Sequence, residues 1–348
     1  MKKTRIHTKV PALLILLLCA SGSVTAQEKE AVDFELFGGE EMLNVSLRFD
    51  ITEMMKKKST EDYQDAVLVY YFDSGDSLVN NIRVRARGNR RLDLCAFPPL
   101  RLNFKNCENS PSDLEGIPNV KLVTHCMSNK KFEEYILKEY LGYKLYNIVS
   151  DTSFRVRLMK INYIDTGRKG FSENLYGFVI EPLDLLCRRI EALELENLVV
   201  RSQYIDPETL DKVCMFQYMI GNEDWFLANL HNLKLYEPIN GNKALKGIVP
   251  YDFDYSGLVN TYYAVPAPVY GLNSIQDRIY AGKCRSDDEF RRLADYFLKR
   301  KDIFIREIES LDLLEEKERK RTIKYIESFF DLYKRDYIIF SMKKTCAE

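Results

Sequence analysis

Side chains that suit a metal–phosphate site gather between residues 216 and 260. An apolar, helix-like run is followed by Asp224, and a strand-like run begins at Asn232. A second strand-like run ends just before Asp252 and Asp254. Carboxylate and carboxamide oxygens are the ligands that magnesium prefers, and strand ends are rigid supports for them. The order Asp, Asn, Asp therefore predicts a magnesium–nucleotide site, and the alternative is an acidic hairpin capped by Asx-turns.

A dense group of arginines comes earlier in the chain. Arg83, Arg85 and Arg87 alternate along a strand-like run, which places three guanidinium groups on one face of the strand. Arg90 and Arg91 add two more after a Gly-Asn turn. Forked donors at this density suit phosphate or carboxylate groups. The alternative is a solvated edge strand whose charges prevent aggregation.

The N-terminal residues have the pattern of a secretory signal. Basic residues precede an apolar run at 12–20, and small residues at 24–26 suit cleavage before Gln27. This apolar run is too short to span a bilayer, and no later run is long enough. The sequence therefore predicts a signal peptide at 1–26 and an exported protein, periplasmic or extracellular, with no transmembrane segment after cleavage.

Composition limits the class of partner. The chain has 348 residues, of which 46% are hydrophobic and 30% charged, so we expect a sizeable folded core. Cleavage removes four of the 51 Lys and Arg and no acid, which leaves 47 against 52 Asp and Glu, a net charge of −5. A mildly acidic surface of mixed charge does not suggest a nucleic-acid partner.

Cysteines and histidines exclude several kinds of site. Seven cysteines remain after cleavage, scattered and without a Cys-x-x-Cys pair, which argues against a zinc module. An odd number leaves at least one thiol outside intramolecular disulfides; Cys95 and Cys107 are close in sequence, but the sequence does not assign pairs. Only His125 and His231 survive cleavage, so a multi-histidine metal centre is excluded and a serine or cysteine hydrolase is disfavoured.

The order of the predicted elements indicates an α+β protein. Six or seven alternating, strand-like runs and one clear helix at 131–148 lie between residues 27 and 181. Mainly helical patterns at 182–348 surround the hairpin that carries Asp224, Asn232 and the two later aspartates. A strand-rich part at 27–181 followed by a helical part at 182–348 predicts two lobes.

Three blocks in this order resemble the spore-coat protein H (CotH) kinase-like family of atypical kinases. The first is Arg87-Gly88-Asn89 with the following Phe97-Pro98-Pro99-Leu100-Arg101-Leu102-Asn103-Phe104, and the second is Tyr176-Gly177-Phe178-Val179-Ile180-Glu181. The third runs from Gly221-Asn222-Glu223-Asp224 through His231-Asn232 to Val249-Pro250-Tyr251-Asp252-Phe253-Asp254. The blocks cover about half of the chain, and the resemblance is remote.

The resemblance implies a bilobal, atypical kinase-like fold and phosphoryl transfer that uses ATP and magnesium. Asp224 would accept the proton of the acceptor hydroxyl, and Asn232 or Asn229 would bind metal together with Asp252 or Asp254. Arg87 and Glu181 would contribute to nucleotide or phosphate binding, as would one of three basic residues: Arg101, Lys105 or Lys121. A helix glutamate, Glu134 or Glu139, would pair with the nucleotide-anchoring cation. The acceptor would be a protein or a small hydroxyl compound.

Two departures from the family pattern favour an alternative. The family's basic strand offers a lysine to the nucleotide, whereas Leu100 to Phe104 contains Arg101, and arginine is no neutral replacement. The stretch between Asp224 and Asn232 is also longer than the family's catalytic loop. The alternative function is a non-catalytic, pseudokinase-like binding protein of the cell envelope.

Overall fold

The computed structural model describes residues 33–88, 90–195, 200–240 and 243–347, which belong to one compact unit, Asp33–Glu348. The signal peptide predicted at 1–26 lies outside the described residues, as does Asn89 of the Arg-Gly-Asn block. We therefore describe the fold from Asp33 onwards.

Seven strands of the first half form a closed barrel in the order β1-β2-β3-β4-β5-β7-β6. Neighbouring strands are antiparallel except β1 and β6, which pair in parallel and close the barrel. Apolar side chains at every second position fill its interior, as the pattern of β3 shows, where Ile82 and Val84 are buried and Arg83 is exposed. The strands are β1 (Leu43–Phe49), β2 (Gln64–Tyr71), β3 (Ser77–Ala86), β4 (Leu100–Asn103), β5 (Asn119–Val123), β6 (Val156–Asp165) and β7 (Ser172–Ile180).

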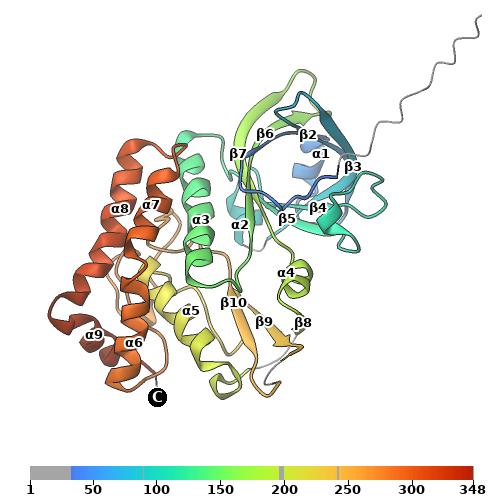
Figure 1. Cartoon of the computed structure of the whole chain (residues 1–348). Coiled ribbons are helices and arrows are strands. Elements are labelled where there is room, and N and C mark those ends of the chain that lie inside the picture. The colour runs from blue at the N-terminus through green and yellow to red at the C-terminus, as the bar shows by residue number, and fades with distance from the viewer. Residues whose placement is uncertain (1–32, 89, 196–199, 241–242, 348) are drawn as a thin grey trace, which may run out of the picture. The chain divides into compact units, whose positions relative to one another are not determined.

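A small antiparallel sheet and most of the helices make up the rest of the unit. The sheet has the order β10-β9-β8 and lies below the barrel in Figure 1. Helices α6 to α9 form the outer layer at the left of the same view. The strands of the sheet are β8 (Ala192–Leu195), β9 (Leu233–Pro238) and β10 (Gly247–Pro250). The helices are α1 (Ile51–Lys56), α2 (Arg90–Leu94), α3 (Lys130–Val149), α4 (Leu183–Arg189), α5 (Pro207–Ile220), α6 (Asp287–Leu298), α7 (Lys301–Ser310), α8 (Glu316–Phe330) and α9 (Tyr337–Thr345).

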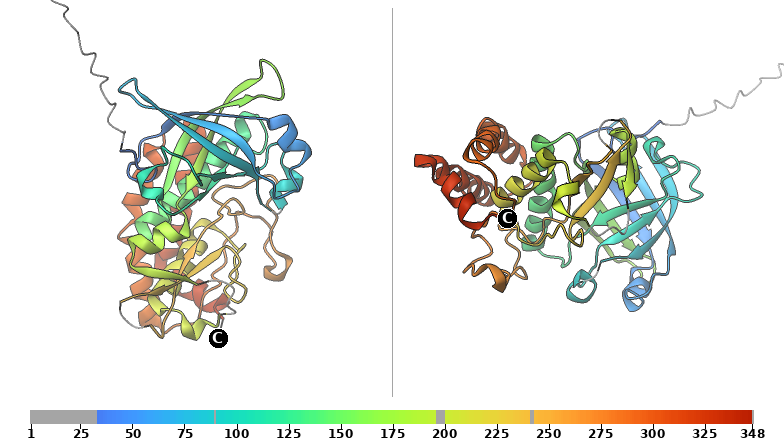
Figure 2. Two further views of the ribbon diagram at one scale, coloured as in Figure 1. Left: turned by 90° about the vertical axis from the view of Figure 1, so that its right-hand side faces the viewer. Right: turned by 90° about the horizontal axis from the view of Figure 1, so that it is seen from below.

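The predicted bilobal, kinase-like fold with a separate strand lobe and helical lobe is wrong. The strands form a closed barrel, because β1 pairs along its whole length with β6, more than 110 residues later. Helix α3, although it lies between β5 and β6 in sequence, packs against α5 and α7 and joins their core. Figures 1 and 2 show α3 standing between the barrel and the outer helices. Strand pairing and helix docking at such separations are tertiary contacts, which periodicity alone does not report.

Two disulfides tie distant segments together. Cys95 pairs with Cys126 rather than with Cys107, and Cys284 pairs with Cys346. Cys107, Cys187 and Cys214 are free, as an odd number of cysteines requires of at least one. The first bridge joins the end of α2, which carries Arg91, to the segment after β5.

Replacing both Cys95 and Cys126 with serine is expected to lower the free energy of unfolding by about 3 kcal/mol, because it removes a cross-link over 31 residues. Urea denaturation of the wild type and the double variant, each without reductant, measures the difference. The matching change at Cys284 and Cys346 is the control for loss of a disulfide away from α2. A Cys95/Cys126 variant as stable as the wild type would contradict the pairing.

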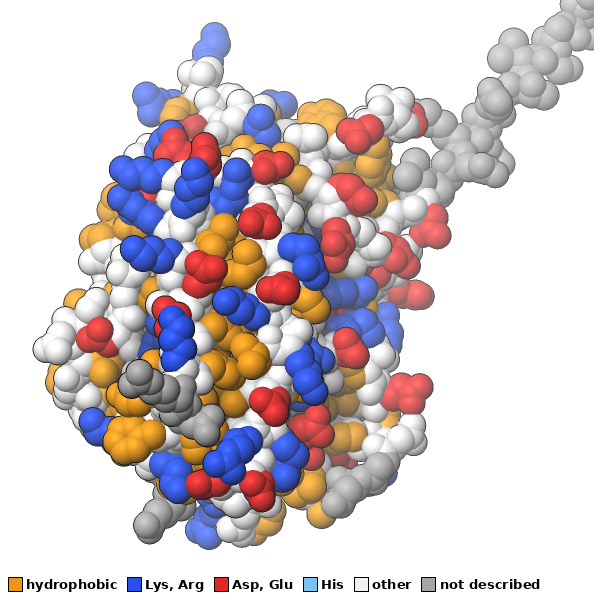
Figure 3. Space-filling model, turned by 60° about the vertical axis from the view of Figure 1, so that its left-hand side comes forward, with side chains coloured by type: hydrophobic (Ala, Val, Ile, Leu, Met, Phe, Trp, Pro, Cys, Tyr) orange, Lys and Arg blue, Asp and Glu red, His pale blue; other side chains and the backbone are white. Residues whose placement is uncertain are grey.

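The surface carries both charge signs. On the face shown in Figure 3, Lys and Arg side chains are interspersed with Asp and Glu and with apolar side chains. None of the helices in the described part of the chain has the length and apolar character needed to cross a membrane.

Candidate functional site

Leaving aside the alternatives Asn229, Lys105, Glu134 and Glu139, a cavity of about 660 Å³ brings together seven of the eight residues that the sequence predicts for the site. It is lined by the outer face of β3, β4 and β5, by α2 with the loop before β2, and by the segments before β9 and after β10. The seven residues are Arg87, Arg101, Lys121, Asp224, Asn232, Asp252 and Asp254. The eighth, Glu181, does not line it.

Three cations stand in a row across one wall of this cavity. Arg85 on β3 is directly opposite Arg101 on β4, and Arg101 is directly opposite Lys121 on β5. The residues beside them in sequence, such as Val84 and Leu102, are buried inside the barrel, so the row points outwards into the cavity. Like charges at directly opposed positions destabilise a sheet. The buried Nε atoms of Arg85 and Arg101 also have no hydrogen-bond partner, so the row is suited to an anion that would supply acceptors.

The hairpin places Asn232 and Asp252 side by side at one end. Strands β9 and β10 pair with Leu233 opposite Pro250, and Tyr251 N donates to Asn232 O at 3.0 Å. Both Asn232 (φ 53°) and Asp252 (φ 63°) have left-handed backbone, a conformation that Asn and Asp tolerate better than other side chains. Asp252 and Asp254 both line the cavity and lie in the segment that follows β10, which ends at Pro250.

Asp224 is held by side chains that precede and follow it in the sequence. Helix α5 ends at Gly221 in left-handed conformation, and the Asn222 side chain then accepts a hydrogen bond from Asp224 N at 3.1 Å. Asn232 Nδ2 donates to Asp224 O at 2.7 Å and to Asp224 Oδ2 at 3.0 Å. His231 Nε2 lies 3.0 Å from Asp224 Oδ1. Both carboxylate oxygens therefore have a partner, and the carboxylate remains about one-third exposed.

The floor of the cavity is a cluster of buried charges. Arg91 Nη1 lies 3.3 Å from Glu139 Oε2 and 3.9 Å from Asp254 Oδ2, and the Tyr263 hydroxyl donates to Asp254 Oδ2 at 2.7 Å. Burial raises the pKa of the Glu139 and Asp254 carboxyls, and the negative charges nearby raise them further. The sequence predicts that Glu134 or Glu139 pairs with the nucleotide-anchoring cation. Glu139 instead pairs with Arg91, and Glu134 pairs with Lys131, so neither pairs with a cation of β4 or β5.

Lys121 is the most perturbed cation of the row. Burial lowers its pKa to about 7, with further lowering by Arg87 and Lys234, while Asp252 acts in the opposite direction. Its Nζ lies 4.7 Å from the centre of the Tyr251 ring. A lysine in this state gains from a bound anion, because the anion restores the charged form.

Nucleotide affinity is expected to fall as the pH rises through about 7, because Lys121 loses its proton there and with it the attraction to phosphate. Calorimetric titration of ATP between pH 6 and 8.5 measures this, with Lys121→Arg as the matched control. The arginine stays charged throughout, so the control cancels the titration of the ligand itself. Identical pH profiles for the two proteins would contradict this role for Lys121.

The residues present fit a magnesium ion that is bound mainly through phosphate oxygens and water. No hydrogen bond or ion pair involves the Asp252 carboxylate within the described residues, and Asn232 Oδ1 is likewise unengaged. Nowhere in the described ranges do three or more His, Cys, Asp or Glu side chains gather to hold a metal. Magnesium at nucleotide sites commonly uses only one or two carboxylates. Asp252 with Asn232 meets that need, whereas Asp254 is engaged by Tyr263 and Arg91.

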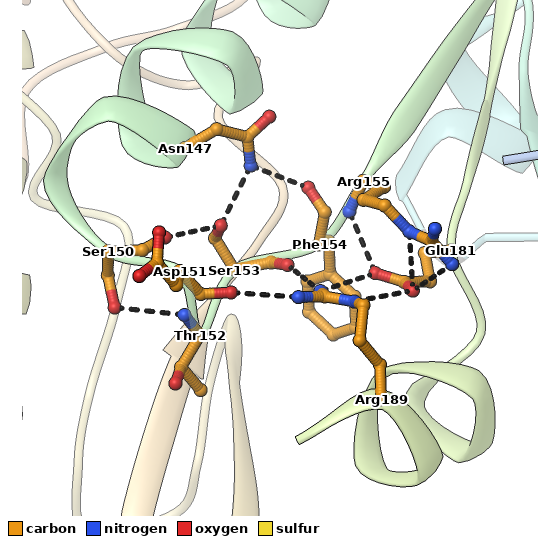
Figure 4. A network of polar contacts seen from close by, with 9 residues as sticks. All are labelled: Asn147, Ser150, Asp151, Thr152, Ser153, Phe154, Arg155, Glu181 and Arg189. Carbon is orange, nitrogen blue, oxygen red and sulfur yellow. Dashed lines mark hydrogen bonds and ion pairs between the residues drawn. The ribbon is translucent and has the colours of Figure 1, made fainter. Parts of the chain in front are cut away.

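Glu181 has a structural environment instead. Its fully buried carboxylate accepts from Arg155 N and Nε, both at 2.9 Å, and from Arg189 Nη2 at 2.9 Å and Nε at 3.2 Å. Arg189 also donates to the carbonyl oxygens of Asp151 and Ser153. Figure 4 shows how this network ties α4 to the segment that leads into β6. Glu181 lines only a smaller neighbouring hollow, together with Lys121 and Lys234.

Changing Glu181 to glutamine is expected to destabilise the fold by about 2–3 kcal/mol, because two arginines lose their charged acceptor. Nucleotide affinity should stay within about twofold of the wild type, since a twofold change is well under 1 kcal/mol. Thermal denaturation and ATP titration of the same preparation separate the two effects. A large loss of affinity without loss of stability would restore the ligand-binding role that the sequence predicts.

Other predicted residues divide clearly. Lys105 faces a different hollow on the barrel, beside Arg48 and Arg83, and Asn229 lies in an exposed loop where its side chain accepts from His231 N. Lys58 and Tyr143 line the cavity without having been predicted. Tyr263, which belongs to a tyrosine-rich segment of the sequence, lines it as well. The Tyr143 hydroxyl accepts a hydrogen bond from Asp252 N at 2.9 Å and so helps to position Asp252.

Comparisons of the chain with protein-family models, with curated proteins and with solved structures find no match. The resemblance to the CotH kinase-like family thus remains a hypothesis, and function is argued from the cavity itself.

Proposed function

We propose that the chain is an exported phosphotransferase that moves a phosphoryl group from ATP to a hydroxyl acceptor. The observation that carries the proposal is one cavity with a row of cations on one wall and Asp224, Asn232 and Asp252 on the facing segments. Phosphoryl transfer needs cations for the phosphates, oxygen ligands for a metal and a carboxylate that orients the nucleophile. The proposal rests on these side chains and not on a kinase-like fold.

Each group of side chains has a distinct task in this proposal. Arg101 and Lys121, with Arg87 beside them, bind the donor phosphates and stabilise the charge that develops during transfer. Asp224 accepts the proton of the acceptor hydroxyl, and His231 and Asn232 hold its carboxylate in place. Asp252 and Asn232 would hold a magnesium ion, which when bound neutralises phosphate charge and aligns donor and acceptor.

Export is part of the proposal. The predicted signal peptide supports it, and so do the two disulfides, since disulfides persist in oxidising compartments. ATP is scarce outside the inner membrane, so the donor has to be tested directly.

A second candidate is a non-catalytic, pseudokinase-like protein of the envelope that binds an anionic ligand in the same cavity. The observation that favours it is the engagement of both Asp224 oxygens by His231 and Asn232. A carboxylate that already has two partners is a weaker proton acceptor for a substrate.

Thermal denaturation of the mature protein with millimolar ATP, with and without magnesium, tests the proposal. A magnesium-dependent rise in Tm supports it, because a ligand that binds the native state stabilises it by mass action. The absence of any shift would count against both candidates as far as ATP is concerned. A radiolabelled transfer assay then separates them, since the non-catalytic protein binds without turnover.

A further inference from the structure

The cavity has cations beyond those assigned to the donor nucleotide. Seven cationic side chains line it against four carboxylates, and Glu139, which pairs with Arg91 at the floor, makes a fifth, so the excess is two. The cations are Lys58, Arg85, Arg87, Arg90, Arg91, Arg101 and Lys121, and the carboxylates are Glu61, Asp224, Asp252 and Asp254. A triphosphate of charge about −4 with one magnesium of charge +2 leaves about −2, which the cations nearest Asp252 can balance.

Apart from Arg91, which pairs with Glu139, the cations divide into two groups by their surroundings. Arg87 and Lys121 interact with each other, with Arg101 and with Asp252, and so belong to the part of the cavity assigned to the donor. Lys58 and Arg90 belong to different elements, the loop that follows α1 and the start of α2. We call Lys58 and Arg90 the rim cations, whereas Arg85, directly opposite Arg101, belongs to the row.

Neither Lys58 nor Arg90 is paired with a carboxylate among the described residues. Lys58 Nζ reaches only the carbonyl oxygen of Cys95, at 3.5 Å. Arg90 Nη1 donates to the Tyr255 hydroxyl at 2.8 Å, and its guanidinium lies 5.4 Å from the centre of the Tyr255 ring. Arg85 has one long ion pair, 3.5 Å, to the exposed Glu61, and its Nε is buried without a partner.

Arg90 is held in place although it is exposed. The Tyr255 hydroxyl accepts a hydrogen bond from the Arg90 guanidinium and donates one to Tyr263 O at 3.0 Å. The Tyr263 hydroxyl in turn donates to the Asp254 carboxylate. The disulfide at Cys95 fixes the end of the same short helix. A guanidinium fixed in this way presents its remaining donors to the cavity at little further cost in side-chain entropy.

We infer that the rim cations form a second anion subsite, and that the acceptor is a small hydroxyl compound that carries a phosphate group. This inference rests on the proposed function and names the acceptor class for the same cavity. The volume of about 660 Å³ has to hold the donor as well, so the part of the acceptor that enters the cavity is small. The acceptor's own phosphate binds at Lys58 and Arg90, and its hydroxyl loses a proton to Asp224 as it attacks the γ-phosphorus. The bond from that phosphorus to the bridging oxygen breaks, and the nucleoside diphosphate leaves.

Calorimetry with glycerol 3-phosphate and glycerol as matched probes tests the subsite. The mature protein is first titrated with a non-hydrolysable ATP analogue and magnesium, then with each probe at saturating nucleotide, and each probe is also titrated without nucleotide. Glycerol 3-phosphate is expected to bind at least about tenfold more tightly than glycerol, a difference of about 1.4 kcal/mol. The double variant Lys58→Gln/Arg90→Gln should lose this preference while its nucleotide affinity stays within twofold.

The variant Arg83→Gln/Lys105→Gln is the matched control, because it removes the same charge from another hollow of the barrel. Equal affinity for the two probes, or equal glycerol 3-phosphate binding by the wild type and the rim variant, would overturn the inference. Displacement of the nucleotide by glycerol 3-phosphate would also overturn it, since all the cations would then serve one anion. Failure of the nucleotide titration alone would refute the proposed function, while the titrations without nucleotide would still decide the rim subsite.

Discussion

Replacing Asp224 with asparagine is expected to lower the rate of phosphoryl transfer by about 10² to 10⁴-fold, the usual contribution of a positioned general base. Asparagine keeps the shape of the side chain and one acceptor oxygen, so one of the hydrogen bonds from His231 and Asn232 can persist. The carboxylate is about one-third exposed, which keeps the cost to the fold small. The measurements are single-turnover transfer and the Kd of the nucleotide, which should be unchanged.

The matched control is Asp302→Asn, the same chemical change at an exposed position of α7 far along the chain from the site. Transfer at the wild-type rate by the Asp224 variant would remove the role of proton acceptor from this residue. If the wild type and the Asp224→Asn variant both bind nucleotide equally well and neither transfers phosphate, the non-catalytic candidate is favoured.

Replacing Lys121 with methionine should weaken nucleotide binding by about 10 to 100-fold, since a hydrogen bond to a charged group is worth about 1.5–3 kcal/mol. The same change should raise the stability of the ligand-free protein. Lys121 stands opposite Arg101 in the sheet, and burial and the charge of Arg87 penalise its protonated form. Methionine retains the apolar stem and removes the charge.

The gain in stability has a predictable dependence on pH. The folded-state pKa of Lys121, about 7, lies below its ordinary value of 10.5, so the unfolded chain binds more protons between these limits and wild-type stability rises with pH there. The advantage of the methionine variant is thus largest below pH 7 and shrinks towards pH 10. Thermal denaturation at pH 6 and pH 9 measures this stability advantage. The Lys121→Met variant is compared with the wild type and with a control variant, Lys105→Met, at an exposed position. A variant that is less stable than the wild type at pH 6 would show that Lys121 supports the fold rather than a ligand.

Local sequence patterns predicted the parts of the site well. Of the three arginines predicted on one strand face, Arg83 and Arg85 lie on the same face of β3, but β3 ends at Ala86, so Arg87 follows the strand. Arg83 lines a different hollow from the other two. The hairpin was also predicted, because an Asn before one strand and an Asp after the next mark its common end. Periodicity and turn residues act over a few positions, so both are readable without a fold.

Other site features depend on partners that lie far away in sequence. Arg91 pairs with Glu139, 48 residues later in the sequence, and the short spacing of Cys95 and Cys107 did not indicate the true bridge to Cys126. Glu181 was selected from its motif, but its carboxylate is taken up by Arg155 and Arg189. A sequence motif shows which type of residue stands at a position. Which side chains that residue contacts depends on which segments pack together in the fold.

The sequence by itself determined the strands of the first half, the hairpin, the helix α3 and the chemical character of the two charged groups, since each follows from short-range spacing. Only the tertiary structure decided that β1 closes a barrel with β6, which replaced the predicted two lobes. It alone also decided that Arg85, Arg101 and Lys121 stand in one row facing Asp252. The physical reason is that register and closure are chosen by the burial of whole apolar faces against each other, a sum over contacts that no single segment contains.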